Sequence, residues 1–146
     1  MHELRFDHRL PCPLPAAALL ERLVEAVRDT DRAPFWPHEL NRVLIPRWEE
    51  GCRFEATYRL GGLTVGRNPY VLAKILPDAG FEYEAGRGHP FTGRISVLVH
   101  ARPEGSELQW SGVYRMASWR PERLFFRQVF EPMFFPRLAQ GLASLR

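Results

Sequence analysis

Four ring side chains with polar tips, Tyr58, Tyr83, Trp110 and Tyr114, stand at alternating positions of segments that have the period of a β-strand. Alternate residues of a strand share one face of a sheet, so all four are predicted on the apolar, inward face. A buried Tyr or Trp usually needs a hydrogen-bonding partner for its O–H or N–H group. These groups therefore either satisfy one another and water, or hold the polar atoms of a bound ligand.

Two charged or titratable residues share the same inward parity. His8 follows the apolar face of the first strand-like segment, so it is either a core histidine bonded to a backbone carbonyl or an acid or base in a pocket. Arg67 has the parity of Val65 and Val71, and a buried Arg needs an anion or several acceptors. The alternative is that Pro69 shifts the register and leaves Arg67 in solvent.

Motifs for metal binding and covalent catalysis are missing from the sequence. Two His-Glu pairs, at positions 2–3 and 38–39, begin like the zinc motif HExxH, but Phe6 and Arg42 stand where its second His is required. The glycine-containing segment 86–90 lacks the third glycine of a dinucleotide-binding loop. No GxSxG elbow is present. We therefore predict no metal, no cofactor and no catalytic residue.

The composition is that of a globular protein, with 146 residues, 45% hydrophobic residues and a net charge of +3. The basic residues are scattered among acidic ones and cluster only at Arg120, Arg123 and Arg127, which argues against nucleic-acid binding. No apolar run is long enough to span a bilayer, and the first seven residues do not form a signal peptide. We predict a cytoplasmic protein without stable membrane insertion, in which Cys12 and Cys52 are reduced.

The hydrophobic periodicity predicts an α+β fold. Residues 2–10 alternate like a half-buried strand, a helical stripe follows from Pro15, and residues 29–31 offer caps for a second short helix. From about residue 40 the pattern is a meander of about six antiparallel strands, with a bulge or bend expected at Asn68-Pro69. Together with the first strand this makes a curved sheet of about six to seven strands, apolar on one face and charged on the other.

A long terminal helix is predicted from about residue 121. Its first half places Phe125, Phe126, Val129 and Met133 on one side, but apolar residues beyond Pro136 fall on the side that is charged earlier. Because two prolines stand at this change, we predict that the helix bends or breaks between Glu131 and Pro136. The alternative is that Phe130, Phe134 and Phe135 face a partner chain.

This order of elements resembles the START-like (SRPBCC) superfamily, the helix-grip fold shared by polyketide cyclase/dehydrase-like proteins, lipid-transfer domains and the birch-pollen allergen. The segment Asp31-Arg32-Ala33-Pro34-Phe35-Trp36-Pro37 is similar to the acidic, then Trp-Pro, segment after the first helix of many members. Pro132 and Pro136 depart from the usual pattern. The resemblance implies one START-like domain over residues 1–146 and a cavity between the sheet and the terminal helix, but no particular reaction.

The favoured function is binding of a hydrophobic small molecule, such as a lipid, isoprenoid, quinone or aromatic polyketide, in that cavity. One alternative is an aromatic cyclase or dehydrase that works by acid–base catalysis there, and another is an interaction protein that forms a homodimer through the terminal helix. The predicted ligand-binding residues are Trp36, Tyr58, Arg67, Tyr83, Trp110, Tyr114, Phe126 and Met133.

Overall fold

A meander of six antiparallel strands is completed by the N-terminal strand, which pairs with the last strand of the meander. The computed structural model describes residues 2–146. The strands are β1 (His2–Cys12), β2 (Asn41–Leu44), β3 (Arg53–Leu60), β4 (Leu63–Leu76), β5 (Gly80–Ala85), β6 (Thr92–Arg102) and β7 (Gly105–Met116). Their order in the sheet is β1-β7-β6-β5-β4-β3-β2, so the predicted curved sheet of six to seven strands is confirmed.

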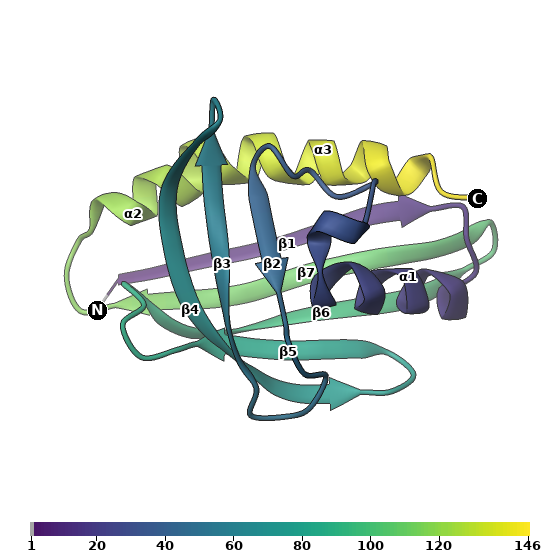
Figure 1. Ribbon diagram of the computed structural model, residues 1–146, viewed down its shortest axis with the longest axis horizontal. Helices are drawn as coiled ribbons and strands as arrows, with labels where there is room; N and C mark the ends of the chain where they lie inside the picture. The colour runs from purple at the N-terminus through teal and green to yellow at the C-terminus, as the bar shows by residue number, and fades with distance from the viewer. Residues whose placement is uncertain (1) are drawn as a thin grey trace.

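The helices lie on one side of this sheet, as an α+β fold requires. They are α1 (Ala16–Arg28), the single 3-10 turn η1 (Thr30–Arg32), α2 (Pro121–Leu124), the π-helix η2 (Phe125–Phe130) and α3 (Glu131–Ala143). Figure 1 shows the sheet curled so that β2 to β4 cross in front of β1, β6 and β7, with the terminal helix along its open side. The second helix expected after β1 is only the turn η1, whose cap is the Asp29 side chain accepting from the Asp31 N–H.

Alternation along the strands separates an apolar inner face from a charged outer face. In β6, Ile95, Val97 and Val99 are buried on the inner face. On the outer face, the neighbouring Arg94 contacts Glu82 and Glu84 of β5 at 3.2 and 3.3 Å. Surface ion pairs of this kind contribute little free energy. The main stabilising contribution to the sheet is therefore the burial of its apolar inner face.

Strand β4 differs from the sequence-based expectation in its register. Of the bulge or bend expected at Asn68-Pro69, the bulge is wrong, because Pro69 pairs in register with Glu55. The pairing shifts instead on either side of it, between Gly66 and Thr64 and between Leu72 and Lys74. Each shift reverses the side-chain parity, so Tyr70 and Leu72 point inward.

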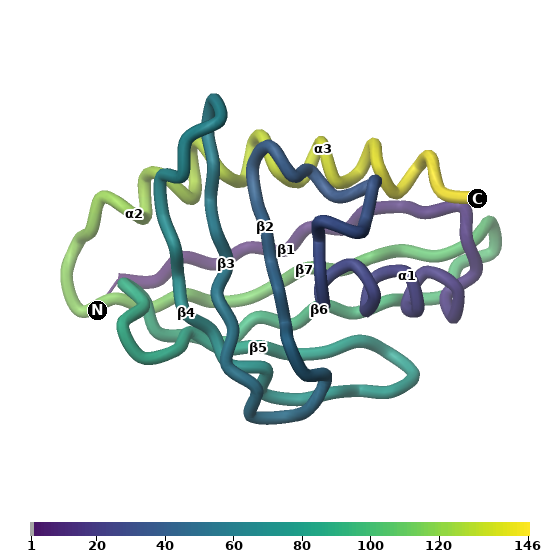
Figure 2. Tube along the Cα trace, in the orientation of Figure 1, coloured from purple at the N-terminus to yellow at the C-terminus, as the bar shows by residue number. Residues whose placement is uncertain are grey.

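The terminal helix departs from α-helical geometry one turn earlier than the prolines suggested. Of the predicted bend or break between Glu131 and Pro136, the break is wrong, because α3 is continuous over this stretch and contains Pro136. A bend at this place stays a prediction. The irregular segment is the π-helix Phe125–Phe130. In Figure 2 the trace follows one continuous helical path from α2 through α3.

The π-helix explains how both apolar halves of the terminal helix face the sheet. In a regular α-helix, residues four apart drift by about 40° around the axis at each step. A π turn holds more residues per turn and offsets part of this drift. Phe126, Phe130, Phe134, Leu138 and Leu142, each four residues apart, all pack against the core. Phe130, Phe134 and Phe135 therefore pack inside this chain, contrary to the alternative that they face a partner.

Candidate ligand-binding cavity

The concave face of the sheet and the terminal helix enclose a cavity of about 40 Å³, which we call the inner cavity. Aromatic side chains form most of its wall: Phe6, Trp36, Phe54, Tyr58, Tyr70, Phe81, Tyr83, Trp110, Tyr114, Phe126, Phe130, Phe134 and Phe135. One water needs roughly 10–15 Å³ by this measure, so the inner cavity has room for about three waters. Drug-sized ligands occupy roughly 300–1,000 Å³, and none fits here unless the walls move.

A larger recess of about 320 Å³, the outer chamber, adjoins the inner cavity. The two spaces share Tyr58, Tyr70, Tyr114 and Phe126 as lining residues. The remaining lining of the outer chamber is Val65, Gly66, Asn68, His89, Phe91, Pro121, Glu122 and Phe125. Its volume lies within the range of small-molecule sites. The shared residues therefore form a wall between a chamber of ligand size and a smaller apolar cavity.

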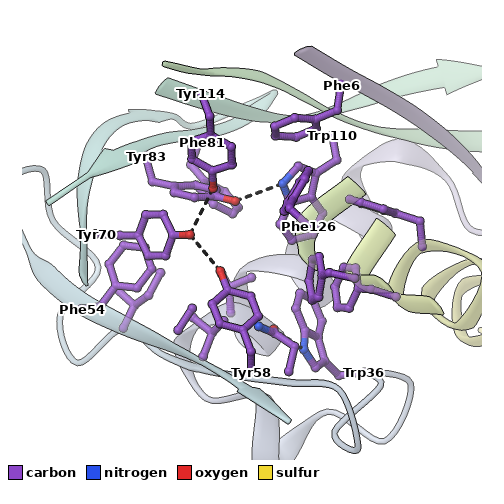
Figure 3. Close-up of a pocket in the computed structure, with 18 residues that line it drawn as sticks. Phe6, Trp36, Phe54, Tyr58, Tyr70, Phe81, Tyr83, Trp110, Tyr114 and Phe126 are labelled. Carbon is purple, nitrogen blue, oxygen red and sulfur yellow. Dashed lines mark hydrogen bonds between the residues drawn. The ribbon is translucent and has the colours of Figure 1, made fainter. Parts of the chain in front are cut away.

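Three tyrosine hydroxyls in this wall are joined in a chain, which we call the tyrosine relay. The hydroxyl oxygens of Tyr58 and Tyr70 are 2.8 Å apart, and those of Tyr70 and Tyr114 are 3.0 Å apart. Figure 3 shows the three hydroxyls pointing toward one another from β3, β4 and β7. Tyr70 is the middle member because the register of β4 turns it inward.

Two tryptophans satisfy their N–H groups inside the same cavity. Trp110 Nε1 donates to the hydroxyl of Tyr83 at 3.1 Å (Figure 3). Trp36 Nε1 donates to Asn41 Oδ1 at 3.1 Å, and Asn41 in turn donates to the carbonyl of Thr57. These bonds anchor the indole rings, so the polar groups of the cavity have fixed positions.

Burial determines the protonation state of the tyrosines. Removal from water raises the pKa of all four cavity tyrosines, Tyr58, Tyr70, Tyr83 and Tyr114. The pKa of a free phenol is already about 10. The four hydroxyls therefore remain protonated at neutral pH and act as neutral hydrogen-bonding groups.

His89, in the loop between β5 and β6, brings a neutral imidazole to the outer chamber. Its Nδ1 accepts the N–H of Phe91 at 2.9 Å, and its ring stacks on Tyr114 with centroids 5.5 Å apart. Burial lowers the pKa of His89 to about 4. At neutral pH the only ring proton is therefore on Nε2, a buried atom for which no residue from 2 to 146 supplies an acceptor.

Six of the eight predicted ligand-binding residues line the inner cavity: Trp36, Tyr58, Tyr83, Trp110, Tyr114 and Phe126. The other two do not, and the prediction is corrected for both. Arg67 is exposed because the shifted register turns it outward, so the alternative of a solvated Arg67 is the one observed. Met133 is 42% exposed because the π-helix changes the phase of the terminal helix.

Sequence reasoning missed Tyr70, Asn41 and His89. Tyr70 and Leu72 alternate with Val65 and Val71, so the two pairs are expected on opposite faces of the strand. A single sequence does not reveal where a strand bulges, and so it does not decide which pair faces inward. His89 was considered only as part of the glycine-containing segment 86–90. Asn41 begins β2 and had no partner in the sequence, because its contact with Trp36 depends on the fold.

His8 has a carboxylate as its partner and not the backbone carbonyl expected of a core histidine. Its Nε2 lies 3.2 Å from Glu131 Oε2, and its ring stacks on Phe135 with centroids 3.7 Å apart. Arg127 donates to the same carboxylate at 2.9 Å. His8 is not among the residues that line the inner cavity or the outer chamber, so this cluster connects β1 to the terminal helix beside the cavity.

Comparisons with solved structures agree with this architecture. Ara h 8.0201 matches with a TM-score of 0.65 and 14% sequence identity, over 97% of this chain and 98% of that one. The di-domain ARO/CYC StfQ from the steffimycin biosynthetic pathway matches with a TM-score of 0.64 and 16% identity. That match covers 97% of this chain, which spans 51% of StfQ.

The chain has a START-like, helix-grip fold.

A third match is the truncated norcoclaurine synthase from Thalictrum flavum, with a TM-score of 0.63 and 10% identity over 99% of this chain and 96% of that one. At such identities the START-like fold is what these structures share with the chain. No protein-family model matches the sequence, and no curated protein sequence matches it either.

Residues 2–146 lack the features of two other kinds of site. No helix in this part of the START-like chain is long and apolar enough to cross a membrane. Within the same residues, no group of three or more His, Cys, Asp or Glu side chains is arranged to hold a metal ion. Cys12 and Cys52 are both free and buried.

Proposed function

We propose that this protein binds a hydrophobic small molecule in the outer chamber and the inner cavity. The observation that carries this proposal is the aromatic wall shared by the two spaces, in which the hydroxyls of the tyrosine relay converge. Burial of apolar ligand surface supplies the driving force, at roughly 25 cal/mol per Å². The hydroxyls fix the orientation of the ligand.

The two volumes suggest how the ligand is placed. A molecule of ligand size enters the outer chamber first, because the inner cavity of about 40 Å³ is too small to receive it. Its apolar end then reaches the inner cavity by displacing Phe126 and members of the relay. Phe126 lies in the π-helix and is only partly buried, so its side chain has room to move toward solvent.

The protonation states favour binding over acid–base catalysis. The tyrosine hydroxyls have raised pKa values and do not ionise near neutral pH. His89, whose pKa is about 4, is a weak base. A general acid or base works best when its pKa is near the operating pH. Among the matched structures, StfQ and norcoclaurine synthase carry names from small-molecule biosynthesis, which supports a small-molecule ligand.

A chamber-filling substitution tests the proposal. Gly66 lines the outer chamber, and a Cβ added there meets only a carbon of Tyr58 at 3.9 Å. Gly66→Leu should therefore fill the chamber without disturbing the backbone. We expect it to weaken binding of the neutral fluorescent probe N-phenyl-1-naphthylamine by at least about tenfold, equivalent to about 1.4 kcal/mol.

The matched control is Thr64→Leu, which adds a leucine on the same strand at an exposed position outside the chamber. This variant should bind the fluorescent probe as the unmodified protein does. The proposal fails if the unmodified protein does not bind the probe, or if Gly66→Leu binds it with unchanged affinity.

A further inference from the structure

The polar groups around the inner cavity and the outer chamber include donors whose protons the protein itself does not accept. The three hydroxyls of the tyrosine relay carry three protons, of which the two bonds between them use two, and the side chain of Asn68 is a further hydrogen-bonding neighbour of Tyr58. Tyr83 accepts from Trp110, and no residue from 2 to 146 accepts the proton of its hydroxyl. Buried donors without acceptors are costly, so these protons favour a bound acceptor.

His89 adds a third donor on the side of the outer chamber. Nδ1 accepts the N–H of Phe91, so the ring proton is on Nε2, and no residue from 2 to 146 accepts it. The ring lies against two relay members, stacked on Tyr114 and edge-on to Tyr70 with centroids 4.9 Å apart. The imidazole therefore lies next to the tyrosine relay in the lining of the outer chamber.

The surroundings argue for a neutral acceptor. Glu122 lines the same chamber, where its carboxylate would repel the carboxylate or phosphate of a lipid. Its nearest cation, Arg120, is already engaged with it at 3.4 Å. The walls consist of flat rings such as Phe91, Phe125 and Phe126, against which a planar molecule packs well.

Building on the proposed function, we infer that the ligand is a planar aromatic ketone or quinone, whose carbonyl oxygen accepts from His89 Nε2–H. The aromatic body of the ligand then faces Phe126 and the inner cavity. This assignment separates the quinone and polyketide classes from acyl lipids and from isoprenoids without a carbonyl group.

A pair of ligands with one shape tests the carbonyl directly. Fluorenone and fluorene are planar tricyclic molecules that differ in one carbonyl oxygen. We expect the unmodified protein to bind fluorenone about tenfold more tightly than fluorene, measured by quenching of tryptophan fluorescence. His89→Asn keeps an acceptor for the Phe91 N–H but lacks the Nε2 donor, so it should bring the affinity ratio close to one. The control His100→Asn, on the outer face of β6 and bonded to Gln109, should retain the ratio.

Nuclear magnetic resonance of the unmodified protein gives a readout that does not depend on folding of a variant. With ¹⁵N-labelled histidine, fluorenone should shift the Nε2 resonance of His89 more than fluorene does and leave His100 in place. If fluorene binds as tightly as fluorenone and His89 does not respond, the carbonyl inference is overturned and the proposed function stands. If neither compound binds, the proposed function is overturned together with this inference.

Discussion

The hydroxyl of a tyrosine buried among aromatic rings usually needs a hydrogen-bonding partner. Tyr70 is such a partner for two neighbouring tyrosines at once. Its hydroxyl contacts those of Tyr58 and Tyr114, which come from strands far apart in the sequence. This central position makes Tyr70 the most sensitive member of the relay. It also means that a ligand reaching the inner cavity must compete with hydrogen bonds that the protein already makes.

Removal of the Tyr70 hydroxyl should therefore be costly. Tyr70→Phe breaks both bonds of the relay and leaves two buried hydroxyls without their partner, so we expect a loss of about 1–3 kcal/mol in the free energy of unfolding. Tyr58→Phe breaks one bond at the end of the chain and should cost less. Urea denaturation of both variants checks the order, and an equal loss for the two would show that the relay is not linked through Tyr70.

His89 gives stability a pH dependence whose sign follows from its buried neutral ring. Its pKa is about 4 in the folded protein, against an ordinary value of 6.5. Between these pH values the unfolded chain binds more protons than the folded protein. The contribution of neutral His89 to the free energy of unfolding is therefore complete above pH 6.5 and falls as the pH drops toward 4. The slope is at most about 1.4 kcal/mol per pH unit, and less because solvent screens the partly exposed ring.

Urea denaturation at pH 7 and pH 5 measures this effect. The unmodified protein should lose stability between the two values, and His89→Asn should lose less, because Asn does not titrate. The other histidines are common to both proteins and cancel in the difference. An equal loss in the two proteins would show that His89 is protonated as readily in the folded state as in the unfolded chain.

At the scale of elements, the terminal helix depends on contacts that its own sequence does not specify. The π-helix Phe125–Phe130 brings Phe126 and Phe130 onto the side of the cavity, where they precede Phe134 on one stripe. Farther along, Gly141 of α3 packs directly against the backbone of Phe35, next to the cavity residue Trp36. The helix thus positions the cavity wall at both of its ends.

Gly141→Ala tests this close approach. Intrinsic helix propensity favours Ala over Gly by roughly 1 kcal/mol, but the added methyl group would overlap the carbonyl oxygen of Phe35. We expect the overlap to dominate, with a net loss of about 1–3 kcal/mol in the free energy of unfolding and weaker probe binding through displacement of Trp36. The exposed neighbour Gln140→Ala is the control and should be neutral or slightly stabilising. A stabilised Gly141→Ala variant would contradict the contact.

At the scale of the whole molecule, a ligand that bridges the sheet and the terminal helix should stabilise both. The outer chamber is lined by β3, β4, β7 and the start of the terminal helix, so its occupant contacts segments from both halves of the chain. A ligand that binds only the folded state raises stability by about 2.7 kcal/mol at a concentration of 100 times its Kd.

Thermal unfolding measures this linkage. For a chain of this size, the added stability corresponds to a rise of roughly 5–10 °C in Tm, and saturating fluorenone should produce it. Gly66→Leu should show a much smaller rise, because its chamber is filled. Equal shifts in the two proteins would place the binding site elsewhere on the molecule.

The sequence alone determined the class of fold and most of the inward face, because the periods of strands and helices are local properties of the chain. Alternation in β6 and β7 placed Trp110 and Tyr114 inside, and the order of elements indicated the START-like fold. Residues 29–31 were expected to offer capping side chains, and Asp29 supplies one, because a cap bonds to residues next to it in the chain.

The tertiary structure decided the features that depend on register, phase and volume. Two register shifts in β4 bring Tyr70 inward and Arg67 outward, and the π-helix turns Met133 toward solvent. Each depends on how a segment packs against distant partners, and a one-residue shift costs little locally although it reverses every side chain beyond it. Cavity size is likewise a small difference between the volume enclosed by the backbone and the volume of its side chains, so only the folded chain fixes it.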